Sequence, residues 1–267
     1  MQGTASREAV FPGDCVSFHV QVEAGAAEQD VEWSGGGEPA MGRGPRFATR
    51  FATGGNFTVA ATLGTDTRGF AVAVCPIEAW LEETAAFYGP SVDLSRVRVK
   101  DSRVVFGGPG MGWTCNDVVR FKRPRQREDF PDPSTLIHEV GHVWEHQDGQ
   151  AQVLRGLLEQ VGRLFGRDPY DYGGPAGLRR ATSLTTLSKE SQAMVLQEYW
   201  RSERGDASDT RGVPFSTPGY IDDLRRLIEG AGIGTRAPRG PRVAGWIDSI
   251  AATLVNAVVG LVDFVGG

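Results

Sequence analysis

Two histidines separated by three residues carry the clearest chemistry in this sequence. They are His138 and His142, in the segment His138-Glu139-Val140-Gly141-His142. Residues i and i+4 of a helix lie on one face, so both imidazoles can bind one Zn²⁺ ion at about 2.0–2.1 Å. Glu139 lies beside them, where its carboxylate can act as general base on the attacking water and pass the proton to a leaving amine. The segment predicts a hydrolytic zinc site.

A catalytic zinc site needs a third protein ligand and one open position. His146 lies one further turn along the helix, too far to complete a compact tetrahedron with the other two histidines. Asp148 follows His142 by six residues, the offset of the third ligand in metzincins, but that class needs a glycine at position 145 for a sharp turn. The residue there is Glu145, so we expect the third ligand from elsewhere in the chain.

A later predicted helix, over residues 189–200, offers two carboxylates as the third ligand. Glu190 and Glu198 are eight residues apart, which is about 12 Å along a helix axis, so only one of them can reach the metal. The run Glu190-x-x-Ala193 resembles the helix that supplies the third ligand in gluzincins. This resemblance favours Glu190, and Glu198 is kept as the alternative.

Other elements must hold these groups in place. Ser134 is expected to cap the metal-binding helix, and residues 112–121 are expected to form a single strand before it. In zincins such a strand lends backbone hydrogen bonds to the substrate. Tyr170, Tyr172 and Tyr199 are each able to stabilise a tetrahedral oxyanion, and we take Tyr199 as the catalytic candidate.

The residues around the histidines resemble a compact zincin over about residues 77–203. The resemblance rests on three runs: Leu136-Ile137-His138-Glu139-x-x-His142-Val143-Trp144, Tyr170-Asp171-Tyr172, and Glu190-x-Gln192-Ala193-x-Val195-x-x-x-Tyr199-Trp200. Similar domains occur in bacterial proteins linked to secretion systems and toxins, and many carry Gln where this chain has Glu145. The resemblance implies a zinc metallopeptidase of gluzincin-like, mainly helical α+β fold. Its metal ligands would be His138, His142 and Glu190, and its substrate a protein or peptide.

The first 76 residues predict an all-β domain. Short strands alternate with turn signals about every 10 residues, a pattern typical of small β-sandwiches. The runs Val31-Glu32-Trp33 and Phe51-x-x-Gly54-Gly55-x-Phe57-Thr58-Val59 resemble bacterial immunoglobulin-like and PKD-like domains. Cys15 and Cys75 would lie at the same end of such a sandwich, either as a disulfide or as two small buried side chains.

We therefore expect a multidomain chain with four parts: an immunoglobulin-like sandwich over 1–76, a zincin-like domain over 77–229, a Gly/Pro/Arg linker over 230–245 and an amphipathic helix over 246–267. Docking of this last helix on the protein's own core is favoured over membrane contact, because its narrow polar stripe lacks Lys and Arg. Two alternatives to an enzyme stay open. One is a non-catalytic zincin-like interaction or secretion-system-associated protein, and the other is a toxin-like effector whose C-terminal helix contacts a membrane.

Composition narrows the remaining function classes. The 267 residues are 40% hydrophobic and 23% charged, as in folded globular proteins. The net charge of −5 argues against a nucleic-acid partner. Residues 1–10 hold no apolar run typical of a signal peptide, and the three cysteines cannot all pair with one another. We therefore expect the chain in the cytoplasm, or exported by a non-classical or secretion-system route, and its oligomeric state stays open.

Overall fold

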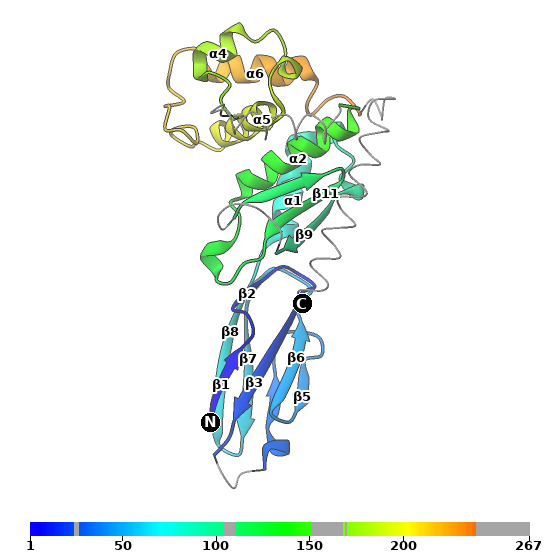
Figure 1. The fold of residues 1–267 in the computed structure, drawn as a ribbon, viewed down its shortest axis with the longest axis vertical. Coiled ribbons are helices and arrows are strands. Elements are labelled where there is room, and N and C mark those ends of the chain that lie inside the picture. Colours follow the sequence, from blue (N-terminus) through cyan, green and yellow to red (C-terminus); the bar gives the residue numbers. More distant parts are fainter. Residues whose placement is uncertain (24–26, 104–109, 151–167, 169, 239–267) are drawn as a thin grey trace. The chain divides into compact units, whose positions relative to one another are not determined.

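The structure, a computed structural model, describes residues 1–23, 27–103, 110–150, 168 and 170–238. Within them, β-sheets at the N-terminal end are followed by a mixed α/β region with five α-helices (Figure 1). One compact unit consists of Met1–Leu81 with Arg123–Phe130, and a second holds the remaining described residues. The helices predicted over 151–165 and 246–267 lie outside the described residues.

The first unit contains two β-sheets. One has the strand order β1-β3-β6 and the other the order β2-β8-β7-β4-β5. All neighbouring strands are antiparallel except β2 and β8, which are parallel. The strands are β1 Gln2–Ala5, β2 Ala9–Val10, β3 Cys15–Gln21, β4 Glu32–Ser34, β5 Met41–Arg43, β6 Arg46–Arg50, β7 Gly55–Leu63 and β8 Asp66–Val74.

Alternation along these strands creates a core between the two sheets. Every second residue of β3 is buried, and Phe18 at its centre joins an aromatic cluster with side chains of both sheets. Its ring centroid lies 5.9 Å from Trp33, 6.3 Å from Phe47 and 5.6 Å from Phe70. The indole N–H of Trp33 donates to the carbonyl oxygen of Gly44 at 2.7 Å, so this large side chain is buried without losing its hydrogen bond.

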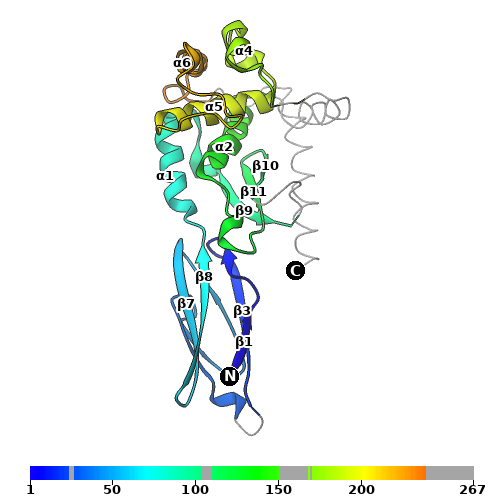
Figure 2. The ribbon, with the colours of Figure 1, turned by 90° about the vertical axis from the view of Figure 1, so that its left-hand side faces the viewer.

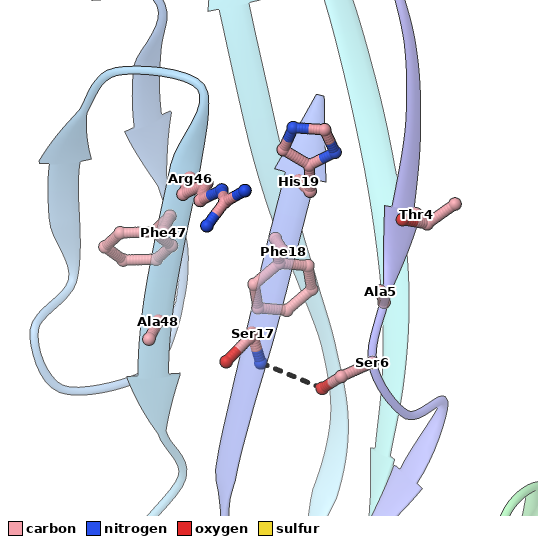
Figure 3. Close-up of a pocket in the computed structure, with 9 residues that line it drawn as sticks. All are labelled: Thr4, Ala5, Ser6, Ser17, Phe18, His19, Arg46, Phe47 and Ala48. Carbon is pink, nitrogen blue, oxygen red and sulfur yellow. Dashed lines mark hydrogen bonds between the residues drawn. The ribbon is translucent and has the colours of Figure 1, made fainter. Parts of the chain in front are cut away.

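A cavity of about 540 Å³ lies on β1, β3 and β6 (Figure 3). The strand registers place Thr4, His19 and Arg46 in one row across its wall. Cys15 and Cys75 are not joined by a disulfide; Cys75 is buried, whereas Cys15 is only partly buried, so the second alternative describes Cys75 alone. Burial, and to a smaller extent a nearby carboxylate, raises the pKa of the Cys75 thiol to about 12, which leaves it unreactive at neutral pH.

The second unit combines a three-stranded sheet with the helices (Figure 2). The sheet has the order β10-β11-β9, in which β9 and β11 are parallel and β10 and β11 antiparallel. Its strands are β9 Arg98–Ser102, β10 Gly112–Cys115 and β11 Val118–Lys122. The helices are α1 Ile77–Tyr88, which begins in the first unit and enters the second at Glu82, α2 Pro133–Gln147, α4 Gly174–Arg180, α5 Lys189–Glu203 and α6 Tyr220–Ala231.

Residues 112–121 form a hairpin and not the single strand that we predicted. Asn116 lies between β10 and β11 with a φ of 55°, in the left-handed region that asparagine tolerates better than most residues. This turn reverses the chain, so that Cys115 pairs with Val118. Among the described strands, β10 therefore lies at the edge of the sheet, where it contacts α2.

The N-terminal cap of α2 is Asp132 and not Ser134. The carboxylate of Asp132 accepts a hydrogen bond from the Ser134 N–H at 2.8 Å, and Pro133 takes the first helical position. The hydroxyl of Ser134 instead accepts a hydrogen bond from the side-chain amide of Gln197 at 2.8 Å. Because proline suits the first helical position, the helix begins earlier than predicted and Ser134 is free to connect α2 with α5.

Helices α1, α2 and α5 meet at Gly141. A Cβ atom at this position would lie 3.1 Å from a side-chain carbon of Leu196, 3.3 Å from the Cα of Ala193 and 3.3 Å from the hydroxyl of Tyr88. The missing side chain therefore allows α5 to approach α2 closely. The Tyr88 hydroxyl donates to the carbonyl oxygen of Ile137 at 2.7 Å, next to the first histidine.

The start of the predicted linker belongs to the helical region. Helix α6 continues to Ala231, and Gly232 ends it in the left-handed conformation with a φ of 76°. The N–H of Gly234 then donates to the Ser91 hydroxyl at 2.9 Å and to the Tyr88 carbonyl oxygen at 3.2 Å. In the part of the chain that the structure describes, no helix combines the length and the apolar character needed to cross a bilayer.

We expect Phe18→Ala to lower the free energy of unfolding of the first unit by about 3–5 kcal/mol, because it leaves a cavity inside the aromatic cluster. The control is Met41→Ala, at a side chain that is 76% exposed, for which we expect a change below about 0.5 kcal/mol. Urea denaturation followed by tryptophan fluorescence measures both. A loss below about 1 kcal/mol for Phe18→Ala would contradict this description of the core.

Candidate metal centre

Three side chains from two helices converge on one point. His138 and His142 lie one turn apart on α2, and Glu190 lies in the first turn of α5. The Oε2 atom of Glu190 is 3.2 Å from Nε2 of His138 and 3.3 Å from Nε2 of His142. The two imidazole rings are nearly perpendicular, with centroids 5.1 Å apart. These residues form a group that can hold a metal ion.

The geometry of this group is compatible with zinc. A tetrahedral Zn²⁺ ion with bonds of about 2.0–2.1 Å separates its ligand atoms by about 3.3 Å, close to the distances observed here. Two imidazole nitrogens and one carboxylate oxygen are a donor set of catalytic zinc sites, which leave the fourth position to water or substrate. The side chains of both histidines are 8% exposed and that of Glu190 is 19% exposed, so the group is largely buried.

Glu145 orients one of the histidines. Its Oε2 atom lies 3.2 Å from Nδ1 of His142, so it holds a proton on Nδ1 and leaves Nε2 to bind a metal. The ammonium group of Lys189 lies 3.6 Å from the same carboxylate and ties the start of α5 to α2. In the sequence, Glu145 stands out only as a departure from similar families, many of which carry Gln there. It follows His142 by three residues, and this spacing predicts that the two side chains contact each other on one face of the helix.

The charges around His142 favour a cation. Burial by itself lowers the pKa of His142, but the carboxylates of Glu190 and Glu145 outweigh burial and raise this pKa to about 10. Burial also acts to raise the pKa of Glu190, but the contacts with His142 and His138 hold it well below its usual range. A proton and a metal ion compete for the same imidazole nitrogen. Surroundings that stabilise the imidazolium therefore also attract a divalent cation.

Glu139 lies against β10, close to the histidines. The hydroxyl of Thr114 donates to its Oε2 atom at 2.6 Å. A Cβ atom at Gly112 would lie 2.5–2.7 Å from atoms of the Glu139 side chain, so a larger residue there would displace this carboxylate. Burial raises the pKa of Glu139, although the charges of His138 and His142 act in the opposite direction. A carboxyl group with a raised pKa beside a metal group has the properties of a general base.

Glu198 and Tyr199 are not brought to this group. Glu198 is fully buried, and its Oε1 atom accepts hydrogen bonds from the N–H and the hydroxyl of Thr210. Tyr199 follows Glu190 by nine residues on α5, which is about 13 Å along the axis. Its hydroxyl accepts a hydrogen bond from Arg225 of α6 at 3.4 Å. The structure therefore separates the alternative third ligand and the predicted catalytic tyrosine from the three clustered side chains.

Tyr170 is the tyrosine that lies beside the metal group. Its ring centroid is 6.1 Å from that of His138. Tyr172, in contrast, is buried with its hydroxyl against the hydroxyl of Tyr220. Asp148 ends α2 as its C-terminal cap and does not join the group. In the sequence, no local pattern distinguishes Tyr170 from Tyr172 and Tyr199.

The fold and this group define a mixed α/β protein with a candidate metal site. No protein-family model matches the chain. Over 130 residues the chain is 28% identical to the type VI secretion system spike protein VgrG2b of Pseudomonas aeruginosa. The match covers 45% of this chain and 12% of that protein, so the chain corresponds to a small part of the relative's length. The comparison therefore gives a distant and partial similarity to a secretion-system protein.

We expect Glu190→Ala to lose bound zinc and Glu198→Gln to retain about one ion per chain. The first change removes a ligand atom, whereas the second keeps the shape of a side chain that is bonded to Thr210. Metal analysis of the dialysed proteins by mass spectrometry measures both. Retention of zinc by Glu190→Ala, or its loss from Glu198→Gln, would contradict the assignment of the third ligand.

Metal binding at pH 7 should release about one proton per ion from His142. With a pKa of about 10 its imidazole is protonated before metal binds, and the metal requires the neutral form. Affinity should therefore rise with pH up to that pKa. Calorimetric titration in two buffers with different ionisation enthalpies measures the release. Glu145→Gln should reduce it by lowering the pKa of His142, and a binding enthalpy independent of buffer would contradict this prediction.

Proposed function

We propose that this chain is a zinc metallopeptidase of the zincin class that hydrolyses peptide bonds. The observation that carries the proposal is the convergence of His138, His142 and Glu190 beside the buried carboxyl group of Glu139. A zinc ion bound there would supply Lewis acidity and make water a nucleophile near neutral pH.

Protein groups around that ion have separate tasks. Glu139 accepts the proton of the attacking water and returns it to the leaving amine, which is the work of a base with a raised pKa. Thr114 donates to Glu139 and fixes the direction of its carboxylate. Glu145 keeps His142 in the tautomer whose Nε2 atom carries no proton.

The edge strand β10 supports a peptide as the substrate. Among the described strands β10 pairs only with β11, so its other edge can accept an extended peptide as an additional strand. Gly112 and Thr114 of the same strand contact Glu139. A peptide paired along β10 would therefore pass directly beside the general base.

The first unit supports an immunoglobulin-like domain as part of this proposal. Its strands β1, β3 and β6 correspond to A, B and E of an immunoglobulin sandwich, and β4, β7 and β8 correspond to C, F and G. Trp33 lies on β4, in the place of the buried tryptophan of strand C. The similarity to VgrG2b further supports the proposal that this chain acts together with a bacterial type VI secretion system.

Glu139→Gln should lower peptide hydrolysis by about 10²–10⁴-fold and leave the zinc content unchanged. Casein and a fluorogenic peptide library are the substrates, and zinc is measured on the same samples. Glu229→Gln, at an exposed position of α6, is the matched control and should retain full activity.

Unchanged hydrolysis by Glu139→Gln would refute the assigned base. A wild-type chain that holds zinc but cleaves nothing would favour the non-catalytic secretion-system alternative. Liposome binding that is lost on deletion of residues 246–267 would favour the membrane-contacting effector.

A further inference from the structure

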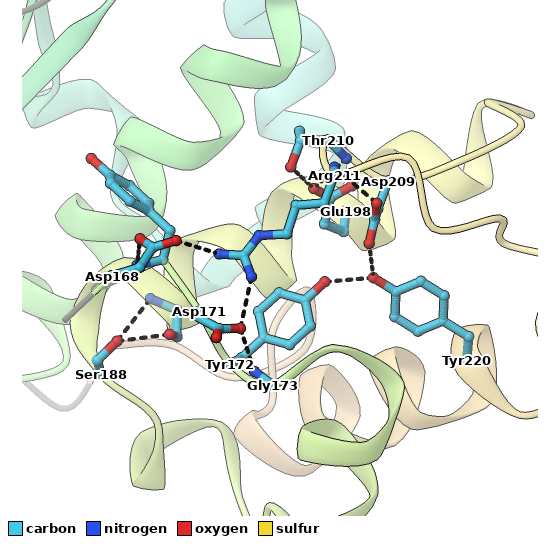
Figure 4. A network of polar contacts seen from close by, with 12 residues as sticks. Asp168, Asp171, Tyr172, Gly173, Ser188, Glu198, Asp209, Thr210, Arg211 and Tyr220 are labelled. Carbon is cyan, nitrogen blue, oxygen red and sulfur yellow. Dashed lines mark hydrogen bonds and ion pairs between the residues drawn. The ribbon is translucent and has the colours of Figure 1, made fainter. Parts of the chain in front are cut away.

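A bidentate arginine holds the segment that carries Tyr170 (Figure 4). Arg211 donates from Nη1 to Oδ1 of Asp171 at 2.7 Å and from Nη2 to Oδ2 of Asp168 at 3.1 Å. The Tyr170 N–H donates to the other oxygen of Asp168 at 3.0 Å. The Gly173 N–H donates to Oδ1 of Asp171 at 2.8 Å. One guanidinium group therefore binds the residues on both sides of Tyr170.

The turn that carries Arg211 is itself anchored to two helices. Asp209 accepts a hydrogen bond from the Arg211 N–H at 2.9 Å and another from the hydroxyl of Tyr220, on α6, at 2.6 Å. The N–H of Thr210 donates to Glu198 of α5 at 2.9 Å. Because the two residues before Arg211 are fixed by these hydrogen bonds, its side chain starts from an anchored turn.

The arrangement around Arg211 is more specific than a surface ion pair. Its side chain is 31% exposed, and its guanidinium carbon lies 5.7 Å from the ring centroid of Tyr172. Planar, two-point binding fixes direction as well as distance, which a lysine cannot reproduce. The hydrogen bond from Gly173, and then that from Arg211, hold the pKa of Asp171 below its usual range, so this carboxylate stays charged at neutral pH.

From this geometry we infer that Tyr170 contacts the substrate at the metal centre and that Arg211 is the positioning residue that keeps it there. The Tyr170 ring lies 6.1 Å from that of His138, a candidate metal ligand. A phenol hydroxyl at this place can donate to a peptide carbonyl oxygen while negative charge develops on it. The inference deepens the proposed function and rests on it for the identity of the substrate.

Amide hydrogen exchange on the metal-free protein tests the positioning step without any turnover. Arg211→Gln should speed exchange of the amides of residues 170–173 by about tenfold or more, because the segment loses two charged hydrogen bonds. Exchange in α2 should stay unchanged. Arg204→Gln is the control. It also removes an arginine from an ion pair, but that pair is with Glu83, outside the segment 168–173. Unchanged exchange at 170–173 would overturn the positioning role.

A double-mutant cycle tests whether Arg211 acts through Tyr170. Tyr170→Phe should lower kcat by about 10–100-fold with KM within about twofold, and Arg211→Gln should lower kcat by about tenfold. The double variant should be no slower than Tyr170→Phe alone, and Arg211→Lys should recover part of the loss. The inference would be overturned if the effects of the two changes on kcat multiply in the double variant, if only KM changes, or if Arg211→Gln loses zinc.

The two proposals fail in different ways. If the wild-type chain cleaves no peptide, the proposed function fails, and binding of a peptide phosphonate replaces turnover as the readout of substrate contact. Tyr170→Phe should then weaken that binding by about tenfold. Equal binding by wild type and Tyr170→Phe, or no binding by either, overturns the contact with substrate. Whether or not the chain cleaves peptides, the hydrogen-exchange experiment tests the positioning role of Arg211.

Discussion

The close approach of α2 and α5 is the constraint on which the metal centre depends. Two of the candidate ligands lie on α2 and the third lies on α5, so the distances between them are set by how these helices pack. Gly141 permits the approach, because any side chain there would meet Ala193 and its neighbours. A hydrogen bond between Ser134 and Gln197 joins the same two helices at another point. Separation by even 1 Å would move Glu190 out of bonding range of a shared ion.

Charge balance gives a second reason for a cation at this place. Three carboxylates lie close together, those of Glu139, Glu145 and Glu190. Lys189 offers one positive charge to them. Buried charges of one sign are costly unless they are paired. A divalent ion added to Lys189 would match the three carboxylates, whereas the metal-free protein must keep protons on groups such as His142, whose raised pKa reflects that demand.

Contacts between residues that are close in the sequence can be predicted from it more readily than contacts between residues that are far apart in it. The pairing of His138 with His142 follows from helix periodicity alone, so the motif predicts it. The position of Glu190 depends on helix packing, and only a resemblance to a known family separated it from Glu198. The hairpin within residues 112–121 depends on one asparagine in a left-handed conformation, which a single-strand pattern conceals. Arg211, which binds the aspartates on both sides of Tyr170, lies 41 positions after it, so no local pattern connects the two residues.

Glu198 has a structural role on α5, apart from the candidate metal group. It was the alternative third ligand, yet it lies two turns along α5 and anchors the turn at Thr210. That turn presents Arg211, which binds the two aspartates around Tyr170. Helix α5 therefore carries a candidate ligand, Glu190, in its first turn and, two turns further on, Glu198, which holds the turn of Arg211. Because a helix is rigid over this distance, the packing of α5 fixes both the position of Glu190 and the position of the turn that carries Arg211.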